Sequence, residues 1–171
     1  YLDLVNDAFN KDKLMGMVQS KKADSAVYDI GCLGKISDYQ KSKDGRVLIN
    51  LTGISRFKIL KEVSNKKLYR EFQVNYDNFS EDINDTNSQT DSSDLMQNAK
   101  VFFKRNGLLI NWKEFEKLDP TQKINTLAMI APITNEEKQK LLETISLENK
   151  VNILDNIISF YLHETNFNNQ T

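Results

Sequence analysis

The hydrophobic pattern changes its period part-way along the chain, and this change restricts the possible folds more than any other feature. Up to residue 77, apolar side chains alternate with polar ones, as in Val47, Ile49 and Leu51, and such alternation is typical of β-strands. From residue 95 onward, apolar side chains recur at the three- and four-residue spacing of α-helices. The sequence therefore predicts an α+β protein in which an antiparallel β unit precedes a set of helices.

The segment between the two patterns has an unusual composition. Residues 78–94 include five acidic residues and no basic one, and they contain almost no apolar side chains. Such a composition disfavours a packed structure. We therefore expect four parts, which are a β-rich subdomain at 1–77, an acidic flexible linker at 78–94, a helical bundle at 95–165 and a disordered tail at 166–171.

Short polar motifs indicate where individual elements begin or turn. Asp44-Gly45 lies between two alternating runs and predicts a tight hairpin, because glycine readily adopts a positive φ. Asp119-Pro120 combines a capping acid with proline at the first helical position, and Thr134 with Glu137 forms a capping-box pattern. Helices are therefore expected to begin at these two places.

The side-chain inventory excludes most catalytic chemistry. The 171 residues include one Cys and one His, and the formal net charge is -1. A single Cys cannot form an internal disulfide, and a Cys/His zinc site of the usual kind cannot be assembled. Cys32 lies in a strand pattern and is expected in the core, whereas His163 is expected at the surface near a helix end. No cofactor and no metal are expected, and the residues predict a protein that binds rather than catalyses.

The motif from Gly31 to Ser37 contains a Gly-Lys pair and could be taken for a phosphate-binding loop. A Walker loop requires four residues between its glycines and a Ser or Thr directly after the Lys. Here two residues separate Gly31 from Gly34, and Ile36 follows Lys35. The two glycines are better explained as positions where a strand bends or bulges.

A cluster of seven basic residues lies between Arg46 and Arg70, with aromatic residues interleaved. Basic and aromatic side chains together can bind the phosphates and bases of RNA. RNA binding is therefore an alternative function, although the nearly balanced charge of the whole chain makes nucleic acid the less favoured partner.

Three motifs in the β-rich part carry a family resemblance: Gly31-Cys-Leu-Gly34, Asp44-Gly45-Arg46 and Gly53-Ile-Ser-Arg56-Phe57. Their residues and spacing resemble the amino-terminal substrate-binding domain of the Lon family of ATP-dependent proteases. In the helical part, Leu127-Ala-Met129 before Pro132, and the run from Glu137 to Glu143, resemble further motifs of this family. The resemblance covers nearly the whole chain except the linker and the tail.

The resemblance implies a PUA-like antiparallel β pseudo-barrel followed by an α-helical bundle. The hairpin would turn at Asp44-Gly45, the chain would bend at Gly53, and Arg56 with Phe57 would hold two strands together. Structural roles rather than ligand contacts are thus implied for Gly31, Gly34, Asp44, Gly45, Gly53, Arg56 and Phe57.

The resemblance also bears on whether the chain is a whole protein or one domain of a longer one. In a complete Lon protease this domain precedes an ATPase module and a Ser-Lys protease module, and neither lies in this sequence. Gly107-Leu108 with Trp112 is similar to shorter bacterial relatives that consist of this domain alone, so a stand-alone protein is favoured over an excised domain. Tyr1 resembles the end of a family segment that follows an apolar strand, and we expect a native strand to precede it.

These observations lead to one expected function and one alternative. The expected function is a non-catalytic, cytoplasmic module that binds unfolded or tagged polypeptide, or a partner protein, through exposed apolar surface and an open sheet edge. Candidate contact residues are Phe102, Phe103 and Trp112, although core packing is the favoured role for each of them. The alternative is RNA binding through the basic residues at 46–70, and no membrane association is expected.

Overall fold

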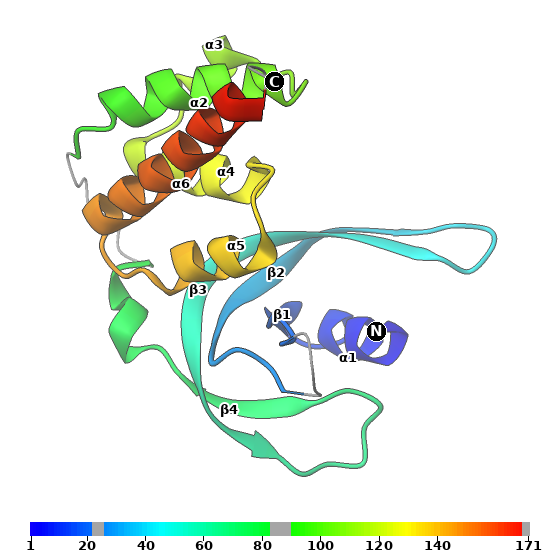
Figure 1. Cartoon of the computed structure of the whole chain (residues 1–171). Helices are drawn as coiled ribbons and strands as arrows, with labels where there is room; N and C mark the ends of the chain where they lie inside the picture. Colours follow the sequence, from blue (N-terminus) through cyan, green and yellow to red (C-terminus); the bar gives the residue numbers. More distant parts are fainter. Residues whose placement is uncertain (22–25, 83–89, 169–171) are drawn as a thin grey trace. The chain divides into compact units, whose positions relative to one another are not determined.

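The computed structural model describes residues 1–21, 26–82 and 90–168. The chain forms two compact units, Tyr1–Asp85 and Thr86–Thr171, and each is described separately (Figure 1). The first is built around an antiparallel sheet, and the described part of the second is helical. The prediction of an α+β protein is therefore confirmed.

The first unit, called the β unit below, contains a leading helix and a four-stranded sheet. Its elements are α1 (Leu2–Phe9), β1 (Leu14–Met17), β2 (Ile30–Lys41), β3 (Val47–Val63) and β4 (Glu71–Asn75). The sheet order is β1-β2-β3-β4 and all neighbours are antiparallel, so each strand pairs with its neighbour in the sequence. β3 pairs with β2 from Val47 to Lys58 and with β4 from Lys58 to Val63, and it bends between the two partners (Figure 1).

The β2–β3 hairpin turns at Asp44-Gly45. Gly45 has a φ of +86°, and its backbone N donates a hydrogen bond to the Ser42 carbonyl at 3.0 Å. The Asp44 carboxylate accepts hydrogen bonds from the backbone N and the Nε of Arg46, at 3.2 and 2.7 Å. The turn therefore uses both the backbone freedom of glycine and the short acceptor side chain of aspartate.

The ring of Phe57 packs directly against the backbone of two glycines. Phe57 is only 3% exposed and is the partner of Gly31 across the β2–β3 ladder. A Cβ atom added at Gly31 would lie 2.6 Å from both the Met17 carbonyl oxygen and Phe57 Cζ, and one added at Gly16 would lie 3.3 Å from the same ring carbon. Gly31 is therefore required by the close approach of this ring.

Replacing Gly31 with alanine is expected to lower the free energy of unfolding by about 1–3 kcal/mol, because the added methyl group overlaps a backbone oxygen and a buried ring. Gly53 is the matched control, since an added Cβ there meets only Cys32 Sγ, at 3.6 Å. Urea denaturation followed by circular dichroism measures both variants. Equal losses in the two variants would contradict this explanation of Gly31.

The start of the expected linker is folded. Residues Asp77–Asp82 form a short 3-10 helix, η1, and Phe79 within it is only 2% exposed. This corrects the expectation of a flexible linker at residues 78–82, because one buried aromatic ring anchors an otherwise polar segment. Residues 83–89 of the expected linker lie outside the described residues, and the first helix of the second unit begins at Ser93.

The second unit, called the helical unit below, consists in its described part of α2 (Ser93–Arg105), α3 (Trp112–Phe115), α4 (Pro120–Ile130), α5 (Asn135–Glu143) and α6 (Leu147–Asn168). Asp119 Oδ1 accepts a hydrogen bond from the Gln122 backbone N at 2.8 Å, and Thr134 with Glu137 forms a complete capping box. Both helices begin where the capping residues predicted. α6 includes residues 166–168 of the expected disordered tail, and residues 169–171 lie outside the described part.

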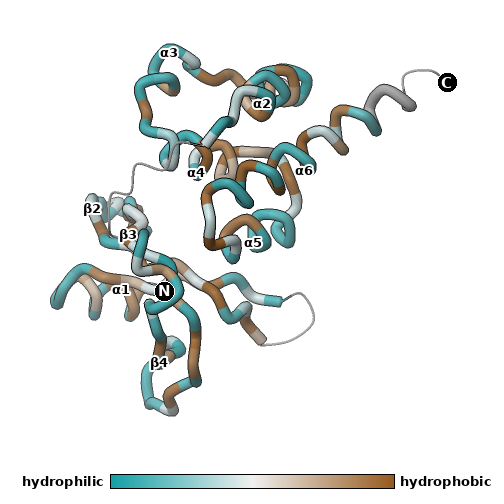
Figure 2. The backbone as a smooth tube through the Cα atoms, turned by 90° about the vertical axis from the view of Figure 1, so that its left-hand side faces the viewer, coloured by the Kyte–Doolittle hydropathy of each residue, from teal (hydrophilic) through white to brown (hydrophobic). Residues whose placement is uncertain are grey.

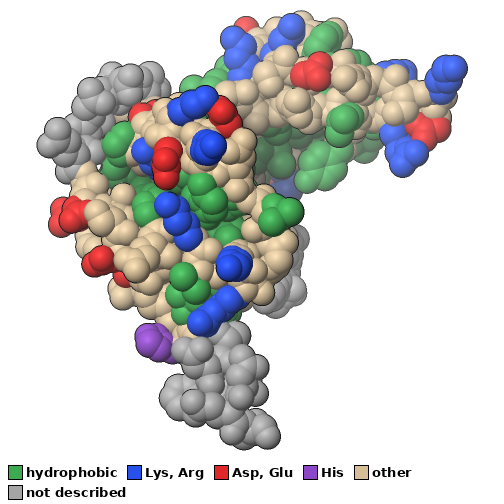
Figure 3. Space-filling model, turned by 90° about the horizontal axis from the view of Figure 1, so that it is seen from above, with side chains coloured by type: hydrophobic (Ala, Val, Ile, Leu, Met, Phe, Trp, Pro, Cys, Tyr) green, Lys and Arg blue, Asp and Glu red, His purple; other side chains and the backbone are tan. Residues whose placement is uncertain are grey.

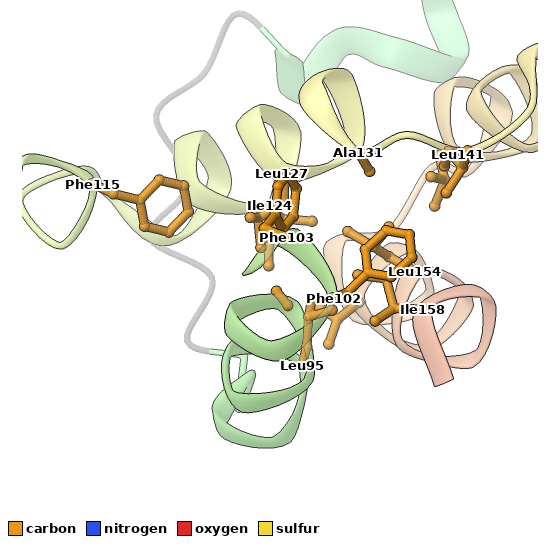
Figure 4. Close-up of a cluster of buried hydrophobic side chains, with 13 residues drawn as sticks. Leu95, Phe102, Phe103, Phe115, Ile124, Leu127, Ala131, Leu141, Leu154 and Ile158 are labelled. Atoms are coloured by element: carbon orange, nitrogen blue, oxygen red, sulfur yellow. The ribbon is translucent and has the colours of Figure 1, made fainter. Parts of the chain in front are cut away.

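The helices of this unit share one core. Side chains from α2, α4, α5 and α6 converge in it (Figure 4), and its largest fully buried members are Phe103, Leu95, Ile124, Leu127, Leu141, Leu154 and Ile158. Hydrophobic and hydrophilic residues alternate along α6 (Figure 2), as expected for a helix that buries one side. None of the helices within the described residues has the length and apolar character needed to cross a membrane.

Candidate functional site

The β unit contains an open groove with a volume of about 820 Å³. Helix α1, strand β1 and the segment from Val63 to Tyr76 line this groove, together with Phe57 of β3. The segment from Val63 to Tyr76 includes β4, so both edge strands of the described sheet contribute to the lining. We call this feature the edge groove.

Several apolar side chains of the edge groove are accessible. Leu14, Met17 and Val63 are 39%, 40% and 43% exposed, and Leu68 is 88% exposed. When a partner covers apolar side chains in a concave surface, their removal from water favours binding. The edge groove is therefore a candidate site for an apolar ligand.

The charges around the edge groove balance one another. Its charged lining residues are three acids and three bases, namely Asp7, Asp12, Glu71, Lys11, Lys67 and Arg70. Lys67 forms an ion pair with Glu71, and Arg70 Nη2 lies 2.6 Å from Glu62 Oε2. The Tyr69 hydroxyl donates a hydrogen bond to Asp7 Oδ2 at 2.6 Å and so links the β3–β4 loop to α1.

These contacts move the titrating groups away from neutral pH. The hydrogen bond from Lys67 lowers the pKa of Glu71, and the same bond raises the pKa of Lys67. The hydrogen bond to Asp7 raises the pKa of Tyr69. General acid–base catalysis requires a pKa near the working pH. These three groups are therefore suited to holding the groove together rather than to proton transfer.

Arg56 fastens η1 to β3. Its Nε and Nη2 donate hydrogen bonds to Asp82 Oδ2 and Oδ1 at 2.9 and 2.7 Å, and its backbone N donates to Asp82 Oδ2 at 2.8 Å. The guanidinium carbon lies 4.5 Å from the centroid of the Phe79 ring. The Arg56 side chain is only 11% exposed. Arg56 therefore ties a strand to a 3-10 helix, whereas the resemblance implied a link between two strands.

The single Cys and the single His lie in different units. Cys32 lies on β2 and is half-buried rather than fully in the core. Burial, together with the negative charge of Asp82, raises the pKa of its thiol and disfavours the reactive thiolate. His163 is exposed on α6. The described residues include no group of three or more His, Cys, Asp or Glu side chains arranged to hold a metal ion.

Phe102, Phe103 and Trp112 come together in the helical unit as packing partners. Phe102 and Phe103 are 3% and 1% exposed, and their rings meet edge to face with centroids 6.0 Å apart. Trp112 is half-buried, with its ring 6.4 Å from that of Phe103 and 5.4 Å from that of Phe115. Phe102 and Phe103 therefore pack in the core, which is the role that the sequence favoured for them over surface contact.

Other apolar side chains of the helical unit do reach the surface. Leu109 is 101% exposed and Met129 is 67% exposed. In the space-filling view, hydrophobic side chains gather on one face of the helical unit, with Lys and Arg side chains around them (Figure 3). This face is a second candidate surface.

Most of the basic residues between Arg46 and Arg70 have acidic partners. Four of the seven form ion pairs, which are Arg46–Asp44, Arg56–Asp82, Lys67–Glu71 and Arg70–Glu62. Such pairing reduces the positive charge available to neutralise phosphates. The arrangement therefore weakens the case for an RNA-binding face.

The residues of the edge groove were not singled out from the sequence. β1 is only four residues long, and residues 64–70 have the composition of an ordinary polar loop. The one available signal was the alternation of Phe72, Val74 and Tyr76, which predicted a strand but not that it lines a groove.

Comparison with known proteins identifies a family and a relative. The family model for the ATP-dependent protease La (LON) substrate-binding domain matches residues 1–159. The Lon protease of Syntrophus aciditrophicus (strain SB) is 25% identical over 178 residues, which cover 95% of this chain and 22% of that protein. The chain therefore spans less than a quarter of the length of this curated relative.

Two solved structures share the fold. The Lon N-terminal domain protein from Xanthomonas campestris matches with a TM-score of 0.64 and 18% identity, over 90% of this chain and 81% of that one. The N-terminal domain of Mycobacterium avium complex Lon protease matches with a TM-score of 0.62 and 16% identity, over 91% of this chain and 82% of that one. At these identities the structures support a common fold.

Proposed function

The chain belongs to the ATP-dependent protease La (LON) substrate-binding domain family, and on this premise we propose that it is a non-catalytic module that binds polypeptide. The observation that carries the proposal is the family match across residues 1–159, which include the whole β unit and most of the helical unit. The partners are unfolded or tagged polypeptides, or a partner protein.

The surface chemistry supports a polypeptide partner. Apolar side chains are exposed in both units, with Leu68 in the β unit and Leu109 in the helical unit as the most accessible leucines. Unfolded polypeptides expose apolar side chains and backbone groups that folded proteins bury. A module that covers these apolar side chains and backbone groups can bind the polypeptide, and such binding requires no catalysis. The ion pairs that involve the basic residues at 46–70 give no comparable support to RNA binding.

A direct test compares one polypeptide in two states. A disulfide-bonded protein that has been reduced and carboxymethylated stays unfolded, and its native form serves as the control. We expect saturable binding of the unfolded form in the micromolar range, measured by fluorescence anisotropy, and binding of the native form weaker by at least about tenfold. Absence of binding up to about 100 μM would contradict the proposal. Tight binding of single-stranded RNA with a steep salt dependence would instead favour the RNA alternative.

A further inference from the structure

We propose that the loop between α2 and α3, together with the adjoining turn of α2, binds polypeptide segments in which apolar side chains are flanked by acidic ones. This part of the helical unit, residues 101–113, is called the α2–α3 surface below. The inference rests on the proposed function and names both the surface and the class of polypeptide that binds there. Exposed leucines in a fixed loop, and lysines beside them that lack acidic partners, support the assignment.

The chain leaves α2 through a Schellman motif, which fixes the start of the loop. Gly107 has a φ of +69°. The backbone N atoms of Gly107 and Leu108 donate hydrogen bonds to the carbonyls of Lys104 and Phe103, at 3.2 and 3.0 Å. The loop of residues 108–110 is short and leads almost directly into α3. Its side chains are therefore presented in a fixed arrangement, and little further ordering of the loop opposes binding.

The apolar side chains of the α2–α3 surface are accessible. Leu108 is 40% exposed and Leu109 is 101% exposed, so none of the described residues shields Leu109. Val101, which is 42% exposed, lies one turn before Lys104 on the side of α2 that points away from the core. Seen from above Figure 1, where α2 and α3 lie at the top of the helical unit, hydrophobic side chains gather among Lys and Arg side chains (Figure 3). Such a surface favours contact with an apolar partner.

The α2–α3 surface also has an excess of positive charge. Residues 100–117 contain five basic and two acidic side chains. Both acids already form ion pairs with lysines of the same segment, which are Lys100–Glu116 at 3.6 Å and Lys117–Glu114 at 2.7 Å. Lys104 and Lys113 lie on either side of the loop, are exposed, and have no acidic partner among the residues that the structure describes. Lysines of this kind beside exposed leucines complement a ligand that is both acidic and apolar.

An acidic polypeptide matches this surface better than RNA or a lipid bilayer. Trp112 is not available to stack on a base, because its ring packs against Phe103 and Phe115 and lies 5.5 Å from Lys100 Nζ. RNA would therefore leave the leucines without an apolar partner. Segments that hold proteins at acidic membranes have about four to eight basic residues, more than the two lysines without acidic partners here.

The test uses three fluorescent peptides of about ten residues, which span about 30 Å when extended. The first has leucines at its centre and glutamates on both sides. The second has lysines in place of the glutamates, and the third has serines in place of the leucines. We expect the first peptide to bind at least about tenfold more tightly than either control in fluorescence anisotropy, and its affinity to fall as the salt concentration rises. Equal affinity for the glutamate and lysine peptides would overturn the selection by charge.

A charge exchange tests the role of the two lysines. Combining Lys104→Glu with Lys113→Glu is expected to weaken binding of the glutamate peptide at least about tenfold and to strengthen binding of the lysine peptide. The control combines Lys43→Glu with Lys66→Glu, at two exposed loop positions of the β unit. This control should change either affinity by less than about twofold. If the first variant loses affinity for both peptides alike, the two lysines do not select the charge and the inference is overturned.

A matched pair of leucine variants tests the location. Leu109 lies in the α2–α3 surface and Leu68 lies in the β unit, and their side chains are 101% and 88% exposed. Leu109→Asp is expected to weaken binding of the glutamate peptide at least about tenfold, because it replaces an apolar contact with a negative charge. Leu68→Asp is expected to change this affinity by less than about twofold. The reverse order of effects would place the site in the edge groove and overturn the inference.

The outcomes separate this inference from the proposed function. If the carboxymethylated protein binds but the glutamate peptide does not, the function stands and the α2–α3 surface is not its site. If analytical ultracentrifugation shows a dimer that Leu109→Asp dissociates, a second copy of the chain covers this surface and the inference is overturned. Tighter binding to phosphatidylserine vesicles or to single-stranded RNA than to the glutamate peptide would also overturn it. If neither the unfolded protein nor the peptide binds, the proposed function itself fails.

Discussion

Replacing Phe103 with alanine is expected to destabilise the helical unit by about 3–5 kcal/mol, because the change leaves a large cavity in a packed core. Phe103 is 1% exposed, and its ring meets Phe102 and Trp112 edge to face. The chain has a single tryptophan, and this tryptophan lies beside the cavity. Tryptophan fluorescence during urea denaturation therefore measures the loss of stability of the helical unit.

Phe160 is the matched control for this substitution. It lies in the same unit, on α6, but is 57% exposed. Phe160→Ala is expected to cost less than about 1 kcal/mol. If Phe103→Ala abolishes binding of the unfolded protein while its unfolding midpoint stays at the wild-type value, the role of Phe103 as a core residue is contradicted and a contact role is restored.

Replacing Asp82 with alanine is expected to destabilise the β unit by about 2–4 kcal/mol. The substitution leaves the Arg56 guanidinium, which is 11% exposed, without the carboxylate that accepts its two hydrogen bonds. It also removes the acceptor of the Arg56 backbone N. η1 then loses its ion pair with β3, and Phe79 should become more accessible. Urea denaturation followed by circular dichroism measures the loss of stability.

The same substitution at Asp44 provides the comparison. Asp44 also pairs with an arginine, but its side chain and that of Arg46 are 48% and 85% exposed. Exposed ion pairs contribute little because water already solvates both charges. Asp44→Ala should therefore cost much less than Asp82→Ala. Equal costs would show that burial of the Arg56–Asp82 pair does not determine its contribution.

The features that the sequence predicted well depend on short-range physics. Alternation at Val47, Ile49 and Leu51 predicted a strand because side chains of a strand point to opposite faces. Asp44-Gly45 indicated a turn, and Asp119 and Thr134 indicated helix starts, because each satisfies backbone groups within a few residues. Such signals need no knowledge of the rest of the fold.

The features that the sequence did not reveal depend on contacts between distant residues. Phe79 lies in a polar, acidic stretch, and its burial depends on Arg56, which is 23 positions earlier in the numbering. Helical periodicity placed Phe102 and Phe103 on an apolar face, but periodicity does not say whether such a face meets a core or a partner. The edge groove combines α1, β1 and β4, and nothing local in any of them indicates the others.

The strand order of the β unit has a consequence for how the unit forms. In the described sheet each strand pairs with the strand next to it in the sequence, and none of these four strands crosses over another. Pairing can therefore proceed by successive closure of loops between neighbouring strands, which keeps the sequence separation of most contacts low. The β unit should consequently assemble faster than sheets of similar size whose neighbouring strands come from opposite ends of the chain.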